Sequence, residues 1–170
     1  GTFSGTINVG TGETYTSLTA NDATGLFNKI NNSVVNGNII VNVTSNLTET
    51  GAVALNQFSE EGIGNYTVHI QPSAASNDTI RGTYAGGLVR INGADRVTID
   101  GTYSGAGKHL VFMNLSNTAN PVINIANASQ KLTINNCVVI GGGNLAFEQG
   151  DYSGADYTSP EGLWYCIRCD

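Results

Sequence analysis

Short runs of alternating apolar and polar residues recur along the middle of the chain, and each run ends at a Gly, Asn or Ser corner. Residues 97–101, Val-Thr-Ile-Asp-Gly, are the clearest copy, and residues 41–44, 68–71 and 132–135 repeat it in degraded form. Alternation over four or five residues predicts a strand with one buried face. Taking the first residue of each run as equivalent gives spacings of 27, 29 and 35 residues.

Two further sets of strands lie between these copies. One set is residues 53–56, 89–92 and 123–126, and the other is residues 46–49, 78–81 and 108–113. Each repeat therefore holds three short strands joined by corners, and no single repeat can bury its own apolar face. The pattern predicts an all-β fold, a right-handed parallel β-helix of about four turns with three short strands per turn.

Stacked turns predict which side chains form ladders along the coil. Two inward ladders are expected: Val41, Val68, Val97 and Leu132, and Val43, Ile70, Ile99 and Ile134. One outward set is expected: Asn42, His69, Thr98 and Thr133. Asn56 and Asn92 end equivalent strands, so their amides are expected to hydrogen-bond along the coil.

The two ends of the chain depart from the repeat. Residues 1–37 hold a short strand and the helical candidate, in which Leu26, Phe27 and Ile30 share one face and Asn21 or Asp22 could cap the start. This segment is expected to act as an N-terminal capping helix for the turns at residues 38–143. Residues 144–170 form an acidic, aromatic tail that is either a loop inserted between turns or a second cap.

Composition narrows the classes of function. Hydrophobic residues make up 40% of the chain but charged residues only 12%, about half the usual share, and the net charge is −6. A negative chain without a basic stripe argues against nucleic-acid binding. No apolar run is long enough to cross a membrane, and the low charge favours a secreted or cell-surface protein.

Two parts of the chain resemble known proteins. The opening strand–helix–strand run, residues 15–18 and 38–49, resembles pectate-lyase-like right-handed β-helices, and residues 86–101 resemble large secreted repeat proteins of the Bacteroidota. The likeness covers residues 5 to 143. It implies a surface or adhesin-like module exported by type IX secretion, with the remainder of a larger polypeptide as its partner. The run Asp-Thr-Ile at residues 78–80 resembles an O-glycosylation site of such proteins, which makes Thr79 a candidate glycan site.

The repeated strands supply little catalytic chemistry. Enzymes with this fold need two or three acids on adjacent turns of one sheet, whereas Asp100 is the acid of its strand position, with Thr44, Gln71 and Asn135 as its expected equivalents, and Asp95 lies across a strand. Asp100 is therefore interpreted as a corner residue. Arg90 and Arg96 are expected on a solvated face, and His69 and His109 are interpreted as structural.

The tail holds the other candidate sites. Asp151, Asp156 and Glu161 could supply oxygen ligands to one Ca²⁺. The aromatic side chains that could stack on sugar rings, or else cover the open end of the coil, are Tyr152, Tyr157, Trp164 and Tyr165. Cys166 and Cys169 are interpreted as a disulfide or as two thiols, because a zinc site needs four ligands.

Together these features favour a non-catalytic, secreted β-helical module that serves as a stalk, an adhesin or a carbohydrate-binding platform, with glycans or other cell-surface components as partners. The rival hypothesis is a fragment of a β-helical polysaccharide lyase or glycoside hydrolase. An ice- or surface-binding solenoid ranks last, because it needs a regular outward array of Thr.

Overall fold

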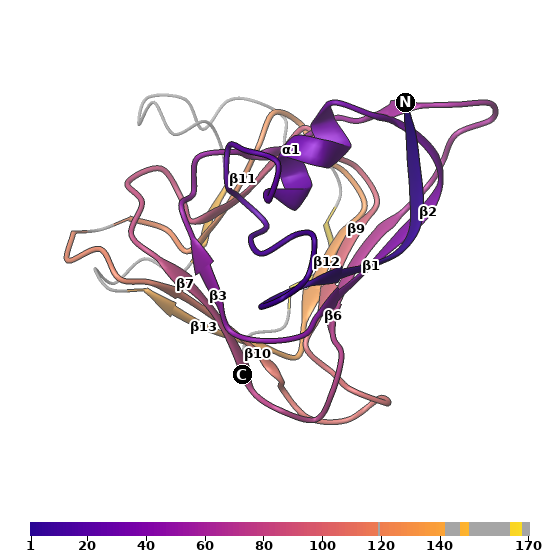
Figure 1. The fold of residues 1–170 in the computed structure, drawn as a ribbon. Coiled ribbons are helices and arrows are strands. Elements are labelled where there is room, and N and C mark those ends of the chain that lie inside the picture. Colours follow the sequence, from indigo (N-terminus) through magenta and orange to yellow (C-terminus); the bar gives the residue numbers. More distant parts are fainter. Residues whose placement is uncertain (119, 142–146, 150–163, 168–170) are drawn as a thin grey trace.

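The chain coils into a parallel β-solenoid of three sheets, shown nearly end-on in a computed structural model (Figure 1). The structure describes residues 1–118, 120–141, 147–149 and 164–167, with side chains described up to residue 141. In each of about four turns the chain visits sheet 1, then sheet 2, then sheet 3. Every pairing between the named strands is parallel, which confirms the predicted all-β solenoid.

The described strands fall into one sheet of seven and two sheets of four. Sheet 1 holds β1 (Thr2–Val9), β2 (Val34–Val43), β6 (Val68–Pro72), β9 (Val97–Asp100), β12 (Leu132–Asn135) and β15 (Trp164–Ile167), with β5 (Ser59–Glu60) paired to β2. Sheet 2 holds β3 (Leu47–Glu49), β7 (Asp78–Gly82), β10 (Leu110–Asn114) and β13 (Cys137–Gly141). Sheet 3 holds β4 (Leu55–Asn56), β8 (Val89–Asn92), β11 (Ile123–Ala126) and β14 (Phe147–Gln149).

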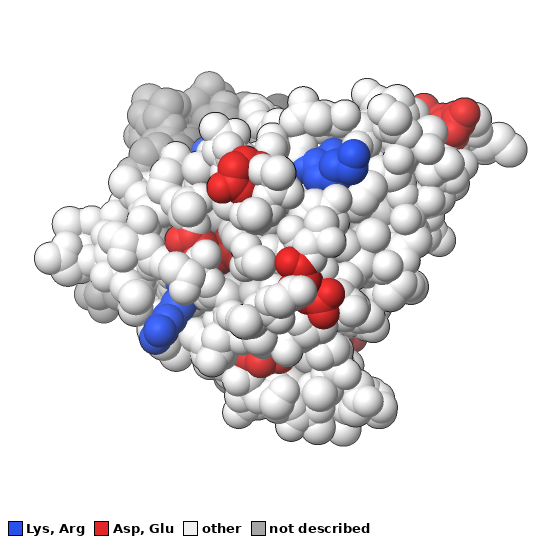
Figure 2. Space-filling model, viewed as in Figure 1, with Lys and Arg blue, Asp and Glu red and all other residues white. Residues whose placement is uncertain are grey.

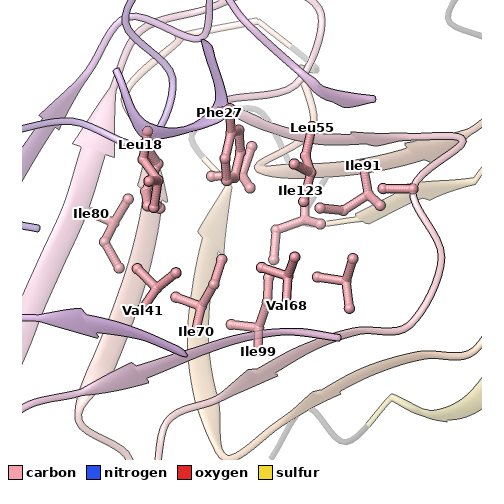
Figure 3. Close-up of a cluster of buried hydrophobic side chains, with 14 of the residues drawn as sticks. Leu18, Phe27, Val41, Leu55, Val68, Ile70, Ile80, Ile91, Ile99 and Ile123 are labelled. Atoms are coloured by element: carbon pink, nitrogen blue, oxygen red, sulfur yellow. The ribbon is translucent and has the colours of Figure 1, made fainter. Parts of the chain in front are cut away.

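Alternate side chains of the three sheets point inward and fill one continuous core (Figure 3). Val41, Ile70 and Ile99 come from successive turns of sheet 1 and are fully buried. Ile80 of sheet 2 and Ile91 of sheet 3 meet them from the other two sides. Each such side chain contributes about 1.5–3 kcal/mol on leaving water, so the stacked apolar ladders hold the coil together.

The predicted register is wrong in the first repeat by two residues. Val41 lies opposite Ile70, and Val68 lies opposite Ile39. A shift of two residues leaves every side chain on the same face of a strand, so alternation alone could not detect it. The later pairings follow the prediction, with Val68 opposite Val97 and Ile70 opposite Ile99.

Residues 1–33 form an N-terminal layer that is fastened to the first strand of sheet 2 by the buried carboxylate of Glu49, which is 3% exposed. This carboxylate accepts hydrogen bonds from the hydroxyls of Ser17, at 2.6 Å, and Thr19, at 2.5 Å. It also accepts the backbone N–H groups of Leu18 and Thr19, both at 2.8 Å. Charge-assisted bonds of this kind are the stronger ones in proteins, so this side chain holds residues 17–19 against sheet 2.

The predicted helix forms as α1 (Leu26–Asn31), and its three apolar residues are fully buried. The predicted cap is wrong, because Gly25 occupies the N-cap position without a side-chain hydrogen bond. Asp22 instead closes a turn by accepting the N–H and hydroxyl of Thr24. Asn31, at the end of α1, bonds to Ala54 and Asn56 at the edge of sheet 3. The role of α1 as a cap stays a prediction.

In the described part of the chain, no helix has the length and apolar character needed to cross a membrane.

Candidate functional site

A column of polar side chains runs along the outer face of sheet 1. Asn8 lies opposite Asn42, and Asn42 lies opposite Gln71. The Asn42 amide donates to Asn8 Oδ1 at 3.4 Å, and the Gln71 amide donates to Asn42 Oδ1 at 3.0 Å. Asp100 and Asn135 continue the column in the next two turns. The first-turn equivalent of Asp100 is therefore Asn42, and the predicted assignment of Thr44 is wrong.

The neighbouring outward column is less polar than the sequence indicates. It runs through Ile40, His69, Thr98 and Thr133, so Ile40 stands where Asn42 was expected. This correction follows from the same two-residue shift of register. Ile40 is 38% exposed, and His69 buries its Nε2 without a hydrogen-bond partner among the described residues. The two aligned Thr residues match the prediction but do not extend into a regular array.

A polar groove of about 340 Å³ opens beside the column of amides. Its floor is Asn42 and Gln71, and its walls come from the corners that follow β6 and β9. The residues that line it are Asn42, Gln71, Pro72, Ser73, Thr102, Tyr103 and Ser104. Amides and hydroxyls both donate and accept hydrogen bonds, so this lining suits a ligand rich in hydroxyl groups.

Tyr103 is the exposed aromatic residue of the groove, with 41% of its surface accessible. It is held in a tight turn by reciprocal backbone hydrogen bonds with Ala106, at 3.0 and 3.1 Å. Ser104 and Gly105 adopt positive φ angles of 51° and 77° in that turn, which fixes the direction of the chain. The ring is therefore carried by an ordered corner while remaining open to solvent.

Asp100 is bound into the corner next to this groove, which agrees with its interpretation as a corner residue. Its Oδ1 accepts the backbone N–H of Thr102 at 2.9 Å and the side-chain amide of Asn136 at 3.2 Å. A Cβ on the following residue, Gly101, would lie 1.8 Å from the carbonyl oxygen of Asn136, so glycine is required there. Asp95 does not join Asp100, because its Oδ1 accepts the backbone N–H of Gln130 at 2.7 Å.

A second groove, of about 400 Å³, lies on the outer face of sheet 3, and Arg90 is one of the residues that line it. The Nη2 of Arg90 donates to the carbonyl oxygens of Gly51 at 2.8 Å and Ala52 at 3.0 Å. Its guanidinium carbon lies 5.0 Å from the centre of the Tyr84 ring. A Cβ on Gly51 would lie 2.4 Å from that ring, so Tyr84 is enclosed between Gly51 and Arg90.

Stacked asparagines border this second groove, as the sequence predicts. The Asn92 amide donates to Asn56 Oδ1 at 2.8 Å, and the Asn127 amide donates to Asn92 Oδ1. The ladder thus links three successive turns of sheet 3. Amides that bond to one another in this way contribute to the coil, as Asn8, Asn42 and Gln71 do on sheet 1.

The expectation of a solvated face is wrong for Arg96, whereas Arg90 does lie on the outer face of sheet 3. The Arg96 side chain is 16% exposed and forms an ion pair of 2.7 Å with Glu60. Its Nε donates to the carbonyl oxygen of Tyr66 at 3.0 Å. Glu60 in turn accepts the N–H of Tyr66 at 2.7 Å, so the pair closes the base of the loop that joins β5 to β6. Sequence reasoning missed both partners, because 36 residues separate Arg96 from Glu60.

The candidate glycan site Thr79 lies on β7, half-buried, and its N–H donates to Asn46 Oδ1 at 2.7 Å. Its neighbour Asp78 is 7% exposed, and one carboxylate oxygen has no hydrogen-bond partner among the described residues. Burial raises the pKa of Asp78 above its ordinary value, while His109 and a hydrogen bond from Ser76 oppose that shift. His109 Nδ1 lies 3.1 Å from Asn77 Oδ1, which agrees with the interpretation of His109 as a structural residue. Glycosylation of Thr79 stays a prediction.

The tail candidates lie outside the part of the chain whose side chains the structure describes. These are the expected calcium ligands Asp151, Asp156 and Glu161, the aromatic residues Tyr152, Tyr157, Trp164 and Tyr165, and the cysteines Cys166 and Cys169. The backbone of β15 pairs with β12, so the chain returns to sheet 1 there. All of these site assignments stay predictions.

Charged side chains are sparse on the end of the coil seen in Figure 2 and do not gather into one patch. Among the described residues, no group of three or more His, Cys, Asp or Glu is placed to hold a metal ion. The sequence analysis missed Tyr103 and Gln71. Their signal was the Tyr-Ser-Gly corner at residues 103–105 and a recurring amide, which follows the buried Val41, Ile70 and Ile134.

No protein-family model matches the chain, and neither a curated protein nor a solved structure is significantly similar to it. The solenoid fold therefore rests on the strand pairing itself. The likeness to pectate-lyase-like proteins and to exported proteins of the Bacteroidota stays a prediction.

Proposed function

We propose that the protein is a non-catalytic binding module for neutral carbohydrate, and that the groove of sheet 1 is its binding site. The strongest support is the meeting, in one groove, of an exposed aromatic ring with a row of amides and hydroxyls. A sugar offers an apolar face of C–H groups and an edge of hydroxyls. Tyr103 suits the face, and Asn42, Gln71 and Ser73 suit the edge.

A neutral ligand fits the groove better than an acidic one. Among the seven lining residues there is no Lys, Arg or His, so an acidic sugar would meet no compensating charge. The nearest carboxylate, that of Asp100, is occupied by two hydrogen bonds to the corner. Because the amides of the column stack along the coil, an extended oligosaccharide could contact successive turns.

A secreted or cell-surface location belongs to the same proposal. Its support is indirect: charged residues make up 12% of the chain, and the outer columns of sheet 1 consist mainly of amides and hydroxyls. Export, adhesion and membership of a larger surface protein are proposed on this ground and on the resemblance described above.

A glycan-array screen of the purified chain, with and without Ca²⁺, tests the proposal. We expect binding to neutral glycans that Tyr103→Ala weakens about tenfold and that the matched variant Tyr103→Phe retains, because the ring is kept. Binding that is unchanged in Tyr103→Ala, or no binding at all, contradicts the proposal. Release of shortened or unsaturated products from a polysaccharide would replace it with the rival lyase or hydrolase hypothesis. Binding that requires Ca²⁺ would direct attention to Asp151, Asp156 and Glu161.

A further inference from the structure

The sequence Asn-Xaa-Ser/Thr (a sequon), in which the asparagine can carry a glycan, occurs seven times in the chain. A transferase that glycosylates a folded protein must reach two groups of a sequon together. These groups are the side-chain amide of the asparagine and the hydroxyl two residues later. The fold therefore decides which of the seven sequons can react.

One sequon keeps its amide available. Six of the seven asparagine side chains hydrogen-bond to another part of the chain: Asn31, Asn42, Asn46, Asn77, Asn114 and Asn127. Asn65 is exposed, and its side chain makes no hydrogen bond to the residues that the structure describes. The amide of Asn65 is therefore free to turn into the active site of a transferase.

The hydroxyl two residues later gives the same ranking. In three sequons it belongs to a residue that is at most 8% exposed: Ser33, Ser116 and Ser129. The hydroxyl of Thr44 donates to the carbonyl oxygen of Val9 at 3.2 Å. Thr48 and Thr79 lie within strands, β3 and β7. Thr67, which completes the sequon of Asn65, is exposed and lies outside the strands.

Asn65 lies in the loop that joins β5 to β6, and this loop projects from the coil (Figure 1). The base of the loop is fixed by the ion pair of 2.7 Å between Glu60 and Arg96. Beyond it, Gly62, Gly64 and Asn65 have positive φ angles of 69°, 70° and 66°, so the backbone turns sharply there. The sequon is thus carried away from the sheets on an ordered base.

Apolar surface stands beside the amide. Ile63, two residues before Asn65, is 95% exposed, whereas the other exposed large hydrophobic residues of the described chain are at most 52% exposed. The first sugar of a glycan has an apolar face of C–H groups. If that face covers part of Ile63, the area removed from water stabilises the loop.

We propose that Asn65 is the acceptor of an N-linked glycan, and that the first sugar of the glycan packs on Ile63. In the transfer, Asn65 Nδ2 loses one proton and forms a bond to C1 of a sugar held on a lipid-linked oligosaccharide. The bond between C1 and the phosphate oxygen of the lipid breaks, and the lipid phosphate leaves with the electron pair. Asn65 precedes β6 and the groove of Tyr103 follows it, so the glycan site is separate from the proposed carbohydrate site.

Transfer to the folded, purified chain tests the acceptor. The reagents are a single-subunit oligosaccharyltransferase that requires only the sequon and a lipid-linked oligosaccharide, and peptide mass spectrometry locates the product. We expect the glycan at Asn65, with Asn46 and Asn127 modified at least tenfold more slowly. Synthetic peptides that span these three sequons should react at similar rates, because in the protein the fold alone protects Asn46 and Asn127.

Two variants of Thr67 sharpen the test. Thr67→Val keeps the shape of the side chain but removes the hydroxyl, and should lower modification of Asn65 at least tenfold. The matched variant Thr67→Ser should retain modification. Each of three results overturns the proposal: no glycan at Asn65 of the folded chain, equal rates at Asn46 or Asn127, or an Asn65 peptide that does not react.

Thermal unfolding tests the contact with Ile63. Glycosylation should raise the unfolding temperature of the wild type more than that of Ile63→Ser, whose exposed side chain can be replaced without disturbing the core. An equal shift in the two proteins would show that the sugar does not pack on Ile63.

Discussion

Both grooves of the coil contain a tyrosine ring and asparagine side chains, but the ring of the sheet 3 groove (the closed groove) is held by the chain's own groups, whereas the ring of the sheet 1 groove (the open groove) stands exposed. Both grooves border a ladder of amides that hydrogen-bond to one another. On sheet 3, Tyr84 lies between Gly51 and Arg90. On sheet 1, Tyr103 stands on a tight turn with 41% of its surface exposed. An aromatic ring beside asparagines is therefore not enough to indicate a binding site, since the partners of the ring decide whether it is available.

The closed groove is tied to the buried polar cluster around Glu49. Thr19, which donates to Glu49, also accepts the N–H of Gly51 at 2.9 Å, and Gly51 accepts Arg90. Replacing Glu49 by Gln leaves buried N–H and hydroxyl donors facing an amide that cannot accept them all. We expect Glu49→Gln to lower the free energy of unfolding by about 3 kcal/mol. Urea denaturation measures this loss.

Carbohydrate binding by folded Glu49→Gln should match the wild type, because the substitution touches the closed groove and not the open one. Unchanged stability would show that the cluster does not fasten the N-terminal layer. If the folded variant lost carbohydrate binding, the binding site would be the groove of sheet 3 and not that of sheet 1.

Arg90→Ala is expected to have the next largest effect. It removes two hydrogen bonds to backbone carbonyls and the cation–π contact with Tyr84, which together should cost about 2 kcal/mol of stability. Thermal unfolding measures the loss, and Arg90→Lys, which retains a positive charge near the ring, should lose less. If Arg90→Ala instead weakens carbohydrate binding at full stability, the groove of sheet 3 is the site.

Tyr103→Ala should show the opposite behaviour. The ring is exposed and its backbone turn needs no side chain, so we expect stability within about 0.5 kcal/mol of the wild type. Binding should fall about tenfold, which corresponds to about 1.4 kcal/mol. Calorimetric titration with the best neutral oligosaccharide measures it. A loss of stability with unchanged affinity would make Tyr103 as structural as Tyr84.

Gln71→Ala is expected to have the smallest effect of the series. It removes one amide from the floor of the open groove and one hydrogen bond to Asn42, and so should cost about 0.5–1 kcal/mol in stability and a few-fold in affinity. Asn92→Ala, its counterpart on sheet 3, should cost similar stability with no change in affinity. Equal changes in affinity for the two variants would remove the distinction between the grooves.

The sequence predicted the solenoid because the apolar repeat is long-range and redundant: three sets of strands recur with similar spacing. It also predicted the Asn56–Asn92 contact, the buried face of α1 and the corner role of Asp100. The two-residue offset of the first repeat was not predicted, because a shift of two residues leaves the alternation of apolar and polar positions unchanged.

The hydrogen-bond partners of Arg90, Arg96 and Glu49 were not predicted for a different reason. They lie 30 or more residues away, one turn along the coil, where no local pattern marks them. The open groove was missed for the same reason, since its lining comes from three successive turns: Asn42, then residues 71–73, then residues 102–104.

The central claim is that the groove of sheet 1 binds neutral carbohydrate, and amide chemical-shift mapping tests it most directly. We would titrate ¹⁵N-labelled protein with the neutral oligosaccharide that the array selects. The account predicts that the largest shifts fall on Gln71, Ser73 and Tyr103. Shifts centred on Tyr84 and Arg90, or on residues 164–167, would contradict it.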